Sequence, residues 1–156
     1  MTTTIQNSAV RLISEGILVQ RATATLPATT SQNIFTISGG RILLVALIGE
    51  VTTAIQAQST TVKVTSTPTT GSAIDMSAAT TDINALEIGG RITLANPPAA
   101  ATALVKTNAG YTDLPGVRTI VPIGTISYTT GATSTGSIKW DLIYIPYDTA
   151  ATVVAA

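Results

Sequence analysis

Apolar and polar residues alternate along most of this chain, in short runs separated by Gly, Pro, Asn and Ser. Alternation with a period of two is typical of strands with one buried face, and many short runs of this kind are typical of an all-β domain. The clearest runs lie at 16–27, 33–38, 41–56, 60–67, 118–128 and 137–147. The pattern predicts a mostly antiparallel all-β fold with little or no helix, either a β-sandwich or a jelly-roll-like barrel.

Two of these runs are expected to form the most deeply buried strands. The run that begins at Arg41 is apolar on both faces from Ile42 to Ile48, so we expect cover on both sides there. In the last run, large side chains from Ile138 to Tyr144 alternate with Lys and Asp and should face the core. The predicted core anchors are Phe35, Leu44, Ile48, Trp140, Leu142 and Tyr144.

The tetrapeptide Gly-Gly-Arg-Ile occurs twice, starting at Gly39 and at Gly89. A phosphate-binding glycine loop would open a helix, but each copy here leads into a predicted strand. Adjacent glycines between strand-like runs favour two-residue hairpin turns, because Gly adopts positive φ angles without steric cost. We therefore predict structural turns at both pairs, with the following arginine reaching solvent or pairing across an interface. The turn residues are Gly39, Gly40, Gly89 and Gly90, and the arginines are Arg41 and Arg91.

The composition suggests how this chain keeps a hydrated surface with few charges. Only 10% of the 156 residues are charged, whereas about a quarter is usual. Thr makes up about a fifth of the chain, and its β-branched side chain suits the exposed face of a strand. The length fits a single domain, residues 1–156. Residues 1–20 carry few apolar anchors, and we expect them to form an extended N-terminal arm that becomes ordered on a neighbour.

Charge and hydropathy argue against two classes of partner. Eight basic and eight acidic residues are spread along the chain, so nucleic-acid binding would release few counterions and is not expected. The longest apolar run, 42–48, is far shorter than the roughly 20 residues of a membrane helix. The N-terminus also lacks the basic start and apolar run of a secretory signal. We expect neither nucleic acid nor membrane as a partner.

The chain contains no His and no Cys, which removes the usual general base, the thiol nucleophile and any disulfide. A Ser–Lys pair would need Lys63, Lys106 or Lys139 as its base, but each is expected to be exposed on a strand or beside a loop. Asp75 and Asp82 match no spacing of a calcium loop. We predict that the protein is not an enzyme and has no catalytic, metal or cofactor site.

Paired carboxylates could still support glycoside hydrolysis, which needs two acids at a fixed separation. Asp141 and Asp148 are the acids that lie near aromatic residues, namely Trp140, Tyr144 and Tyr147. Aromatic residues in an alternating strand usually anchor a core, so we expect Trp140 and Tyr144 to be buried rather than to stack on sugar.

The segment 107–116 has no strand pattern and is rich in Gly and Pro near its end. Irregular loops of this length often carry binding residues. The predicted partner contacts in and just after this loop are Tyr111, Asp113 and Arg118.

Two stretches, 34–64 and 124–156, carry a family likeness. The first contains an Ile-Gly-Glu-Val-Thr strand, and the second contains Thr-Gly-Ser-Ile-Lys-Trp and then Ile-Pro-Tyr-Asp before an Ala-rich end. In these features, which cover close to half of the chain, it resembles small structural proteins from the virion gene clusters of tailed bacteriophages.

The resemblance implies a capsid decoration (cement) protein on the head surface of the virion. Such proteins are small β-rich modules, often homotrimers, that bind the major capsid protein or another virion protein and clamp neighbouring capsomers. The chain differs from the best-known decoration proteins in its longer C-terminal β region and its lack of an obvious helix. The alternative is therefore a module of a tail or head fibre, including one that binds carbohydrate.

Overall fold

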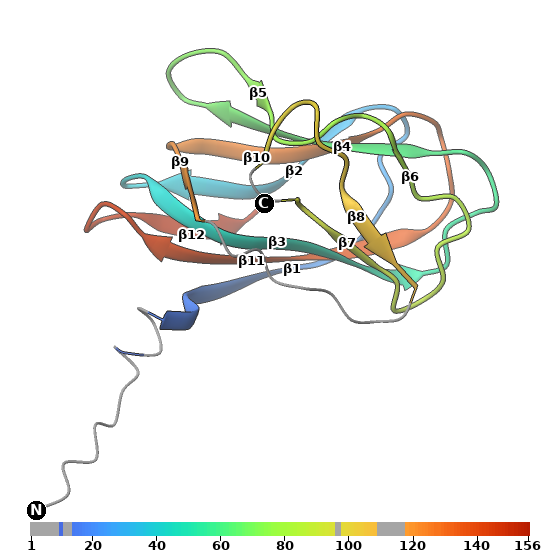
Figure 1. The fold of residues 1–156 in the computed structure, drawn as a ribbon, viewed down its shortest axis with the longest axis horizontal. Coiled ribbons are helices and arrows are strands. Elements are labelled where there is room, and N and C mark those ends of the chain that lie inside the picture. The colour runs from blue at the N-terminus through green and yellow to red at the C-terminus, as the bar shows by residue number, and fades with distance from the viewer. Residues whose placement is uncertain (1–9, 11–13, 96–97, 109–117) are drawn as a thin grey trace, which may run out of the picture.

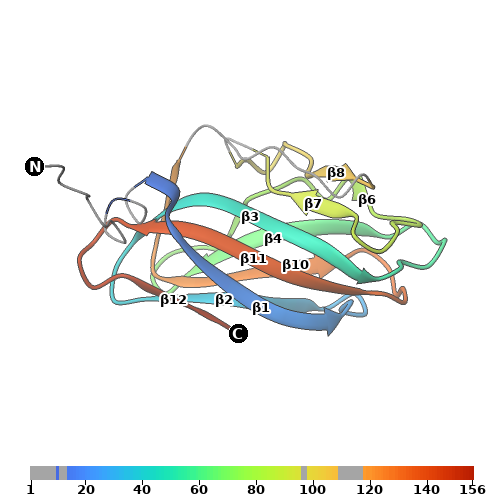
Figure 2. The same cartoon turned by 90° about the horizontal axis from the view of Figure 1, so that it is seen from below.

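The computed structural model describes residues 10, 14–95, 98–108 and 118–156. Twelve strands make up about half of these residues and form two antiparallel sheets that pack face to face, as Figures 1 and 2 show. The all-β prediction is confirmed. Of its two alternatives, the described residues form the sandwich and not a closed barrel.

The first sheet, called sheet A, has the strand order β1-β11-β3-β7-β8. Strand β9 also pairs with β3, at Ile42–Leu44, whereas β7 pairs with the later residues Ile48–Glu50. The strands of sheet A are β1 (Ile17–Thr25), β3 (Ile42–Thr53), β7 (Arg91–Thr93), β8 (Val105–Thr107), β9 (Thr119–Val121) and β11 (Ser137–Pro146).

The second sheet, called sheet B, has the order β12-β2-β10-β4-β5, and β6 also pairs with β4. Its long strands carry mainly Thr and Ser on the outer face, in line with the Thr-rich composition. The strands of sheet B are β2 (Ser31–Ser38), β4 (Thr61–Pro68), β5 (Ile74–Asp75), β6 (Thr81–Asp82), β10 (Gly124–Thr130) and β12 (Thr152–Ala155).

The core lies between the two sheets and contains five of the six predicted anchors, whereas the sixth, Ile48, is buried on the other face of sheet A, opposite Asp141. Phe35 of β2, Leu44 and Ile48 of β3, and Trp140, Leu142 and Tyr144 of β11 are buried. Alternate residues of β11 point into this core, as the sequence pattern predicts.

Strand β3 differs from the prediction in where it is covered on both faces. Continuous burial runs from Ala46 to Gly49, whereas Leu43 and Val45 are only half-buried. The register with β11 shifts between Ile143 and Tyr144, which leaves Val45 as an extra residue in a β-bulge. Within this chain the first half of the strand is therefore not fully covered at Leu43 and Val45, and cover of these residues by a neighbouring subunit stays a prediction.

The hairpin prediction for the glycine pairs is wrong. Residues before Gly39 belong to sheet B and residues after Gly40 to sheet A, so this pair crosses between the sheets. Before Gly89 the chain forms no strand at 86–88, so no hairpin forms there either. Each pair does lead into a strand, and Gly39 and Gly89 have positive φ angles of 72° and 84°.

The N-terminal boundary of the folded part lies earlier than the predicted end of the arm. Residues Ile17–Gln20 belong to β1 and pair with β11, so they are not part of an arm. A helical turn at Ser14 and Glu15 precedes β1. Residues 1–9 and 11–13 lie outside the described residues. Within the described part of the chain, no helix is long and apolar enough to cross a membrane.

Candidate functional site

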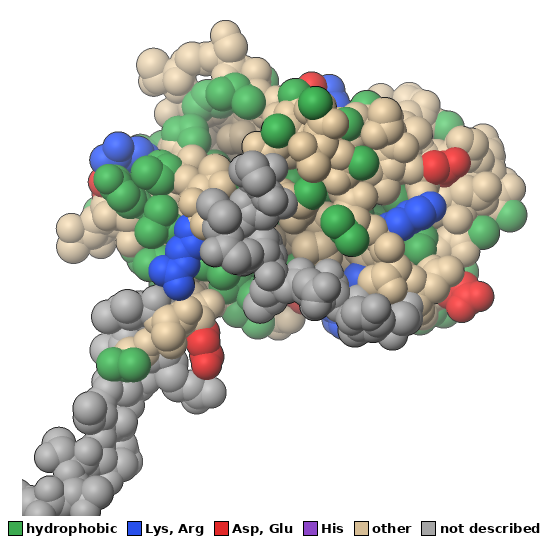
Figure 3. All heavy atoms as spheres, viewed as in Figure 1, with side chains coloured by type: hydrophobic (Ala, Val, Ile, Leu, Met, Phe, Trp, Pro, Cys, Tyr) green, Lys and Arg blue, Asp and Glu red, His purple; other side chains and the backbone are tan. Residues whose placement is uncertain are grey.

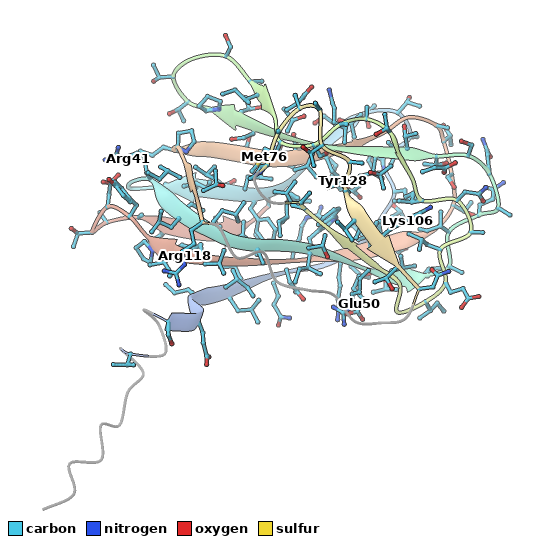
Figure 4. All side chains as sticks on the ribbon, viewed as in Figure 1. Arg41, Glu50, Met76, Lys106, Arg118 and Tyr128 are labelled. Carbon is cyan, nitrogen blue, oxygen red and sulfur yellow. The ribbon has the colours of Figure 1, made fainter. Side chains whose placement is uncertain are left out.

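Four connections between strands meet at one end of the sandwich. They are the β2–β3, β4–β5, β9–β10 and β11–β12 connections, and Arg41 marks this end in Figure 4. Backbone hydrogen bonds join them in pairs: Tyr147 N and Asp148 N donate to the carbonyl of Arg41, and Thr69 N donates to that of Ile123. Figure 3 shows hydrophobic side chains gathered around the same end.

Arg41 and Asp148 form a bidentate ion pair across this end. Arg41 Nε and Nη2 donate to the two carboxylate oxygens of Asp148, each at 2.9 Å, and Arg41 N donates to Oδ2 at 2.8 Å. The guanidinium also lies 4.7 Å from the centroid of the Tyr147 ring, a cation–π arrangement. Hydrogen bonds from Arg41 lower the pKa of Asp148 to about 2, and the same carboxylate raises the pKa of Arg41. Both groups therefore stay charged at neutral pH.

The first glycine pair allows this contact because it leaves room for the β11–β12 connection. A Cβ atom on Gly39 would collide with the carbonyl oxygen of Ala150, and one on Gly40 would lie 2.6 Å from Asp148 Cβ. Gly-Gly-Arg thus joins two connections that are far apart in sequence: the glycines let the chains approach, and the arginine holds Asp148.

The second copy makes a different contact. Arg91 Nη2 lies 2.8 Å from Glu50 Oε2, and Lys139 Nζ lies 3.3 Å from the other oxygen of Glu50. Arg91, Glu50 and Lys139 come from the neighbouring strands β7, β3 and β11, so this cluster supports the register of sheet A. Each arginine pairs within its own chain.

Two hollows adjoin at the end marked by Arg41. The first, of about 290 Å³, is open and lies between Arg41, Thr69, Thr70 and Ile123. The second, of about 210 Å³, lies between the edge strands β5 and β9, and we call it the β5–β9 groove. Pro68 and Pro122 line both hollows. The β5–β9 groove is lined by Ser66, Pro68, Ile74, Asp75, Met76, Pro98, Thr119, Ile120, Val121 and Pro122.

The β5–β9 groove is an apolar surface on which the described residues include large side chains exposed to solvent. Ile74 is 63% exposed and Ile120 is 48% exposed, while Met76 and Val121 are buried beneath them. The charged residue in the lining, Asp75, is bonded to Lys63 Nζ at 3.1 Å and to Thr65 Oγ1 at 3.0 Å. The groove is also smaller than the roughly 300–1,000 Å³ of typical small-molecule pockets. It suits apolar side chains of another polypeptide better than a polar ligand.

The sugar-binding and hydrolase constellations are not assembled. Trp140 and Tyr144 are buried in the core, so they offer no stacking surface, whereas Tyr147 is 49% exposed. Asp141 accepts a hydrogen bond from Gln20 on the outer face of sheet A. It lies five residues before the end of β11, about 17 Å of extended strand, while Asp148 follows that strand.

The three lysines and Asp82 also have structural partners. Lys63 pairs with Asp75, Lys106 donates to the carbonyl of Asp82, and Lys139 pairs with Glu50. Backbone N–H groups of Thr60 and Asn84 lower the pKa of Asp82. Within the described ranges, no three His, Cys, Asp or Glu side chains are close enough together to hold a metal ion.

A buried polar cluster lies near the β1 and β12 edges. Arg21 Nε donates to the carbonyl oxygen of Ala156 at 2.9 Å, and the rings of Tyr128 and Trp140 lie 5.2 Å apart between the sheets. Burial raises the pKa of Tyr128 to about 12, partly opposed by the charge of Arg21. Tyr128 is therefore neutral at physiological pH and serves the core.

Of the three predicted partner contacts, Tyr111 and Asp113 lie outside the described residues. Arg118 is exposed just before β9, and its Nη2 lies 3.3 Å from the carbonyl oxygen of Ser14. Ile74, Ile120 and Ile123 are exposed surface residues that the sequence pattern did not predict. Ile74 offered a signal, because an isolated apolar residue in the polar stretch 69–75 has little local core to join.

The Arg41–Asp148 ion pair and the apolar β5–β9 groove lie at the same end of the sandwich. No protein-family model, curated protein or solved structure matches the chain, so this geometry, together with the sequence, is the basis for a functional interpretation.

Proposed function

We propose that this chain is a non-enzymatic structural protein of a tailed-bacteriophage particle, most specifically a capsid decoration protein. In this role it binds the assembled head, as a homotrimer, and stabilises contacts between capsomers. The observation that carries the proposal is the β5–β9 groove, where Ile74 and Ile120 form an exposed apolar surface with no free charge in its lining. Apolar patches of this kind mark protein interaction sites.

The charge distribution supports binding to protein rather than catalysis. Arg41, Lys63, Arg91 and Lys139 all pair with acids of the same chain. Residues 34–64 and 124–156 resemble small virion proteins of tailed bacteriophages, and this resemblance is the reason for proposing a phage particle as the assembly.

Binding to particles tests the proposal. Particles are produced from a phage in which the gene for this chain is deleted, and purified protein is added back and sedimented with them. The wild-type protein should bind saturably, and Ile74→Asp with Ile120→Asp should weaken binding at least tenfold, because two charges would be buried in a contact between neighbouring chains of the head-bound assembly.

Ile88→Asp is the matched control, because Ile88 is 69% exposed and lies outside the groove. It should bind like the wild type. Wild-type protein that does not bind, or an Ile88→Asp variant that is impaired as strongly as the groove variant, would contradict the proposal.

A fibre module that binds carbohydrate is the second candidate. The observation that favours it is the exposed ring of Tyr147, stacked on Arg41 beside the carboxylate of Asp148. Binding on a glycan array that disappears in Tyr147→Ala but persists in Ile88→Ala would support it. An array with no binding by the wild-type protein would reject it.

A further inference from the structure

The walls of the β5–β9 groove are two strand edges. Among the described residues, β5 pairs only with β4 and β9 pairs only with β3, so each strand has one edge without a strand partner there. Unpaired edges with an apolar hollow between them are the surface on which an extended peptide adds as a new strand. Backbone hydrogen bonds would then supply affinity, and the hollow would accept alternate side chains.

The size and lining of the groove define its occupant. A volume of about 210 Å³ between Ile74, Ile120 and Met76 has room for one or two aliphatic side chains. The peptide should therefore be β-prone and uncharged, with one large apolar residue between small polar residues.

The N-terminal segment of this chain has this composition. Residues 1–9 read Met-Thr-Thr-Thr-Ile-Gln-Asn-Ser-Ala and contain no charged side chain. Thr is β-branched and favours strands. Ile5 is the one branched aliphatic residue in the segment and is flanked by Thr and Gln.

Ser14, shortly before β1, lies beside the start of β9 in sheet A. The carbonyl of Ser14 lies within 3.3 Å of Arg118, which directly precedes β9, and Arg118 is at the lower left in Figure 4. Further toward the N-terminus, the side chain of Val10 is 52% exposed, which leaves about half of it open to contacts outside this domain. Nine extended residues span about 30 Å, which is enough to reach a neighbouring molecule.

We infer that residues 1–9 of one copy add as a strand to the β5–β9 groove of a second copy, with Ile5 filling the hollow between Ile74 and Ile120. This inference uses the homo-oligomer of the proposed function and does not depend on the virion. Each copy gives one arm and accepts one, which closes a ring when the rotation between copies allows it.

The absence of cysteine from the chain permits a clean cross-linking test. Ile5→Cys protein and Ile120→Cys protein are mixed and oxidised, and the disulfide between positions 5 and 120 is measured as linked peptides after digestion, because the symmetric disulfides also give twice the 15.9 kDa chain mass. Two Cys residues link when their Cα atoms lie within about 7 Å. We expect at least tenfold more mixed product from this pair than from Ile5→Cys with Ile88→Cys, a more exposed position outside the groove.

The oligomer provides a second readout that needs no cysteine. Ile5→Asp should raise the dissociation constant of the oligomer at least tenfold in a concentration series of light-scattering masses. Gln6→Asp adds the same charge at the neighbouring position, whose side chain points away from the hollow, and should leave the constant unchanged within twofold.

Several results would overturn the inference. Cross-linking could be equal at positions 120 and 88, the wild-type protein could be monomeric, or the oligomer could be unaffected by Ile5→Asp. A single chain that carries both Ile5→Cys and Ile120→Cys could also form its disulfide only within that chain. The proposed function can fail separately. In that case residues 1–9 cross-link to the groove of a second copy, but the wild-type protein does not bind particles.

Discussion

At the scale of single residues, one tetrapeptide has two different roles. Gly39 lies against the backbone of Ala150, and the following Arg41 holds Asp148, so the first copy fixes one end of the sandwich. Gly89 has a similar φ angle but faces open space. The sequence alone could predict the positive φ angles, which depend on local sterics, but not the contact with the β11–β12 connection more than a hundred residues away.

Replacing each of these glycines by alanine separates conformation from contact. Gly89→Ala should cost about 1–2 kcal/mol of unfolding free energy, from the positive φ angle alone. Gly39→Ala should cost at least about 1 kcal/mol more, because its Cβ would also displace the carbonyl of Ala150. Urea unfolding of the two variants measures the difference. Equal losses of unfolding free energy in the two variants would mean that the close approach of Gly39 to Ala150 does not affect stability.

The Arg41–Asp148 pair predicts a specific pH dependence. The pKa of Asp148 is about 2 in the folded chain, below the ordinary value of about 3.9. Because this folded-state pKa is lowered, the stabilisation is fully present above about pH 4 and is lost as the pH falls toward 2. Carboxyl NMR titration should give a value near 2, rising toward the ordinary value in Arg41→Gln.

Asp82 is the internal control in the same titration, because its lowered pKa comes from the N–H groups of Thr60 and Asn84 and not from Arg41. Its titration should be the same in both proteins. An Asp148 pKa near 3.9 in the wild type would show that the ion pair does not form in solution.

Among the secondary-structure elements, the long strands were predicted well from the sequence pattern. The alternation of apolar and polar residues is local to each strand and does not depend on which other strand it pairs with. The sequence pattern failed where pairing depends on distant parts of the chain. Nothing local reveals that β2 and β3 belong to different sheets. Strand β12 was missed because Thr152–Ala155 is short and lies in an Ala-rich end, although Val153 points inward and Val154 outward. Its pairing with β2 completes the edge of sheet B.

Neighbouring valines of β12 test whether this strand is formed. Val153→Thr should cost about 1–3 kcal/mol, because a hydroxyl group of nearly the same size would be buried. Val154→Thr makes the identical change on the exposed face and should stay within about 0.5 kcal/mol of the wild type. Urea midpoints compare the two variants. Similar small losses at both positions would mean that β12 does not pack on the core in solution.

At the scale of the whole molecule, the candidate site was the part least open to prediction from sequence. Ile74 and Ile120 lie in segments about 45 residues apart, and only the packing of the two sheets brings them to one groove. Sequence reasoning instead placed the partner contacts at Tyr111, Asp113 and Arg118, of which Arg118 lies beside β9. The low charge of the composition indicated a β domain suited to protein contacts. This agrees with a groove in which the one charged lining residue, Asp75, is paired with Lys63.

The location of the protein on a purified phage particle is the decisive test of its proposed role as a capsid decoration protein. Cryo-electron microscopy of particles from the encoding phage, compared with particles that lack the gene, would reveal the added density. We expect a β-sandwich at regular positions on the head shell, with the end that carries Arg41 and the β5–β9 groove in contact with a neighbouring chain. Particles that are identical with and without the gene, or a head-bound module whose groove faces solvent, would contradict it.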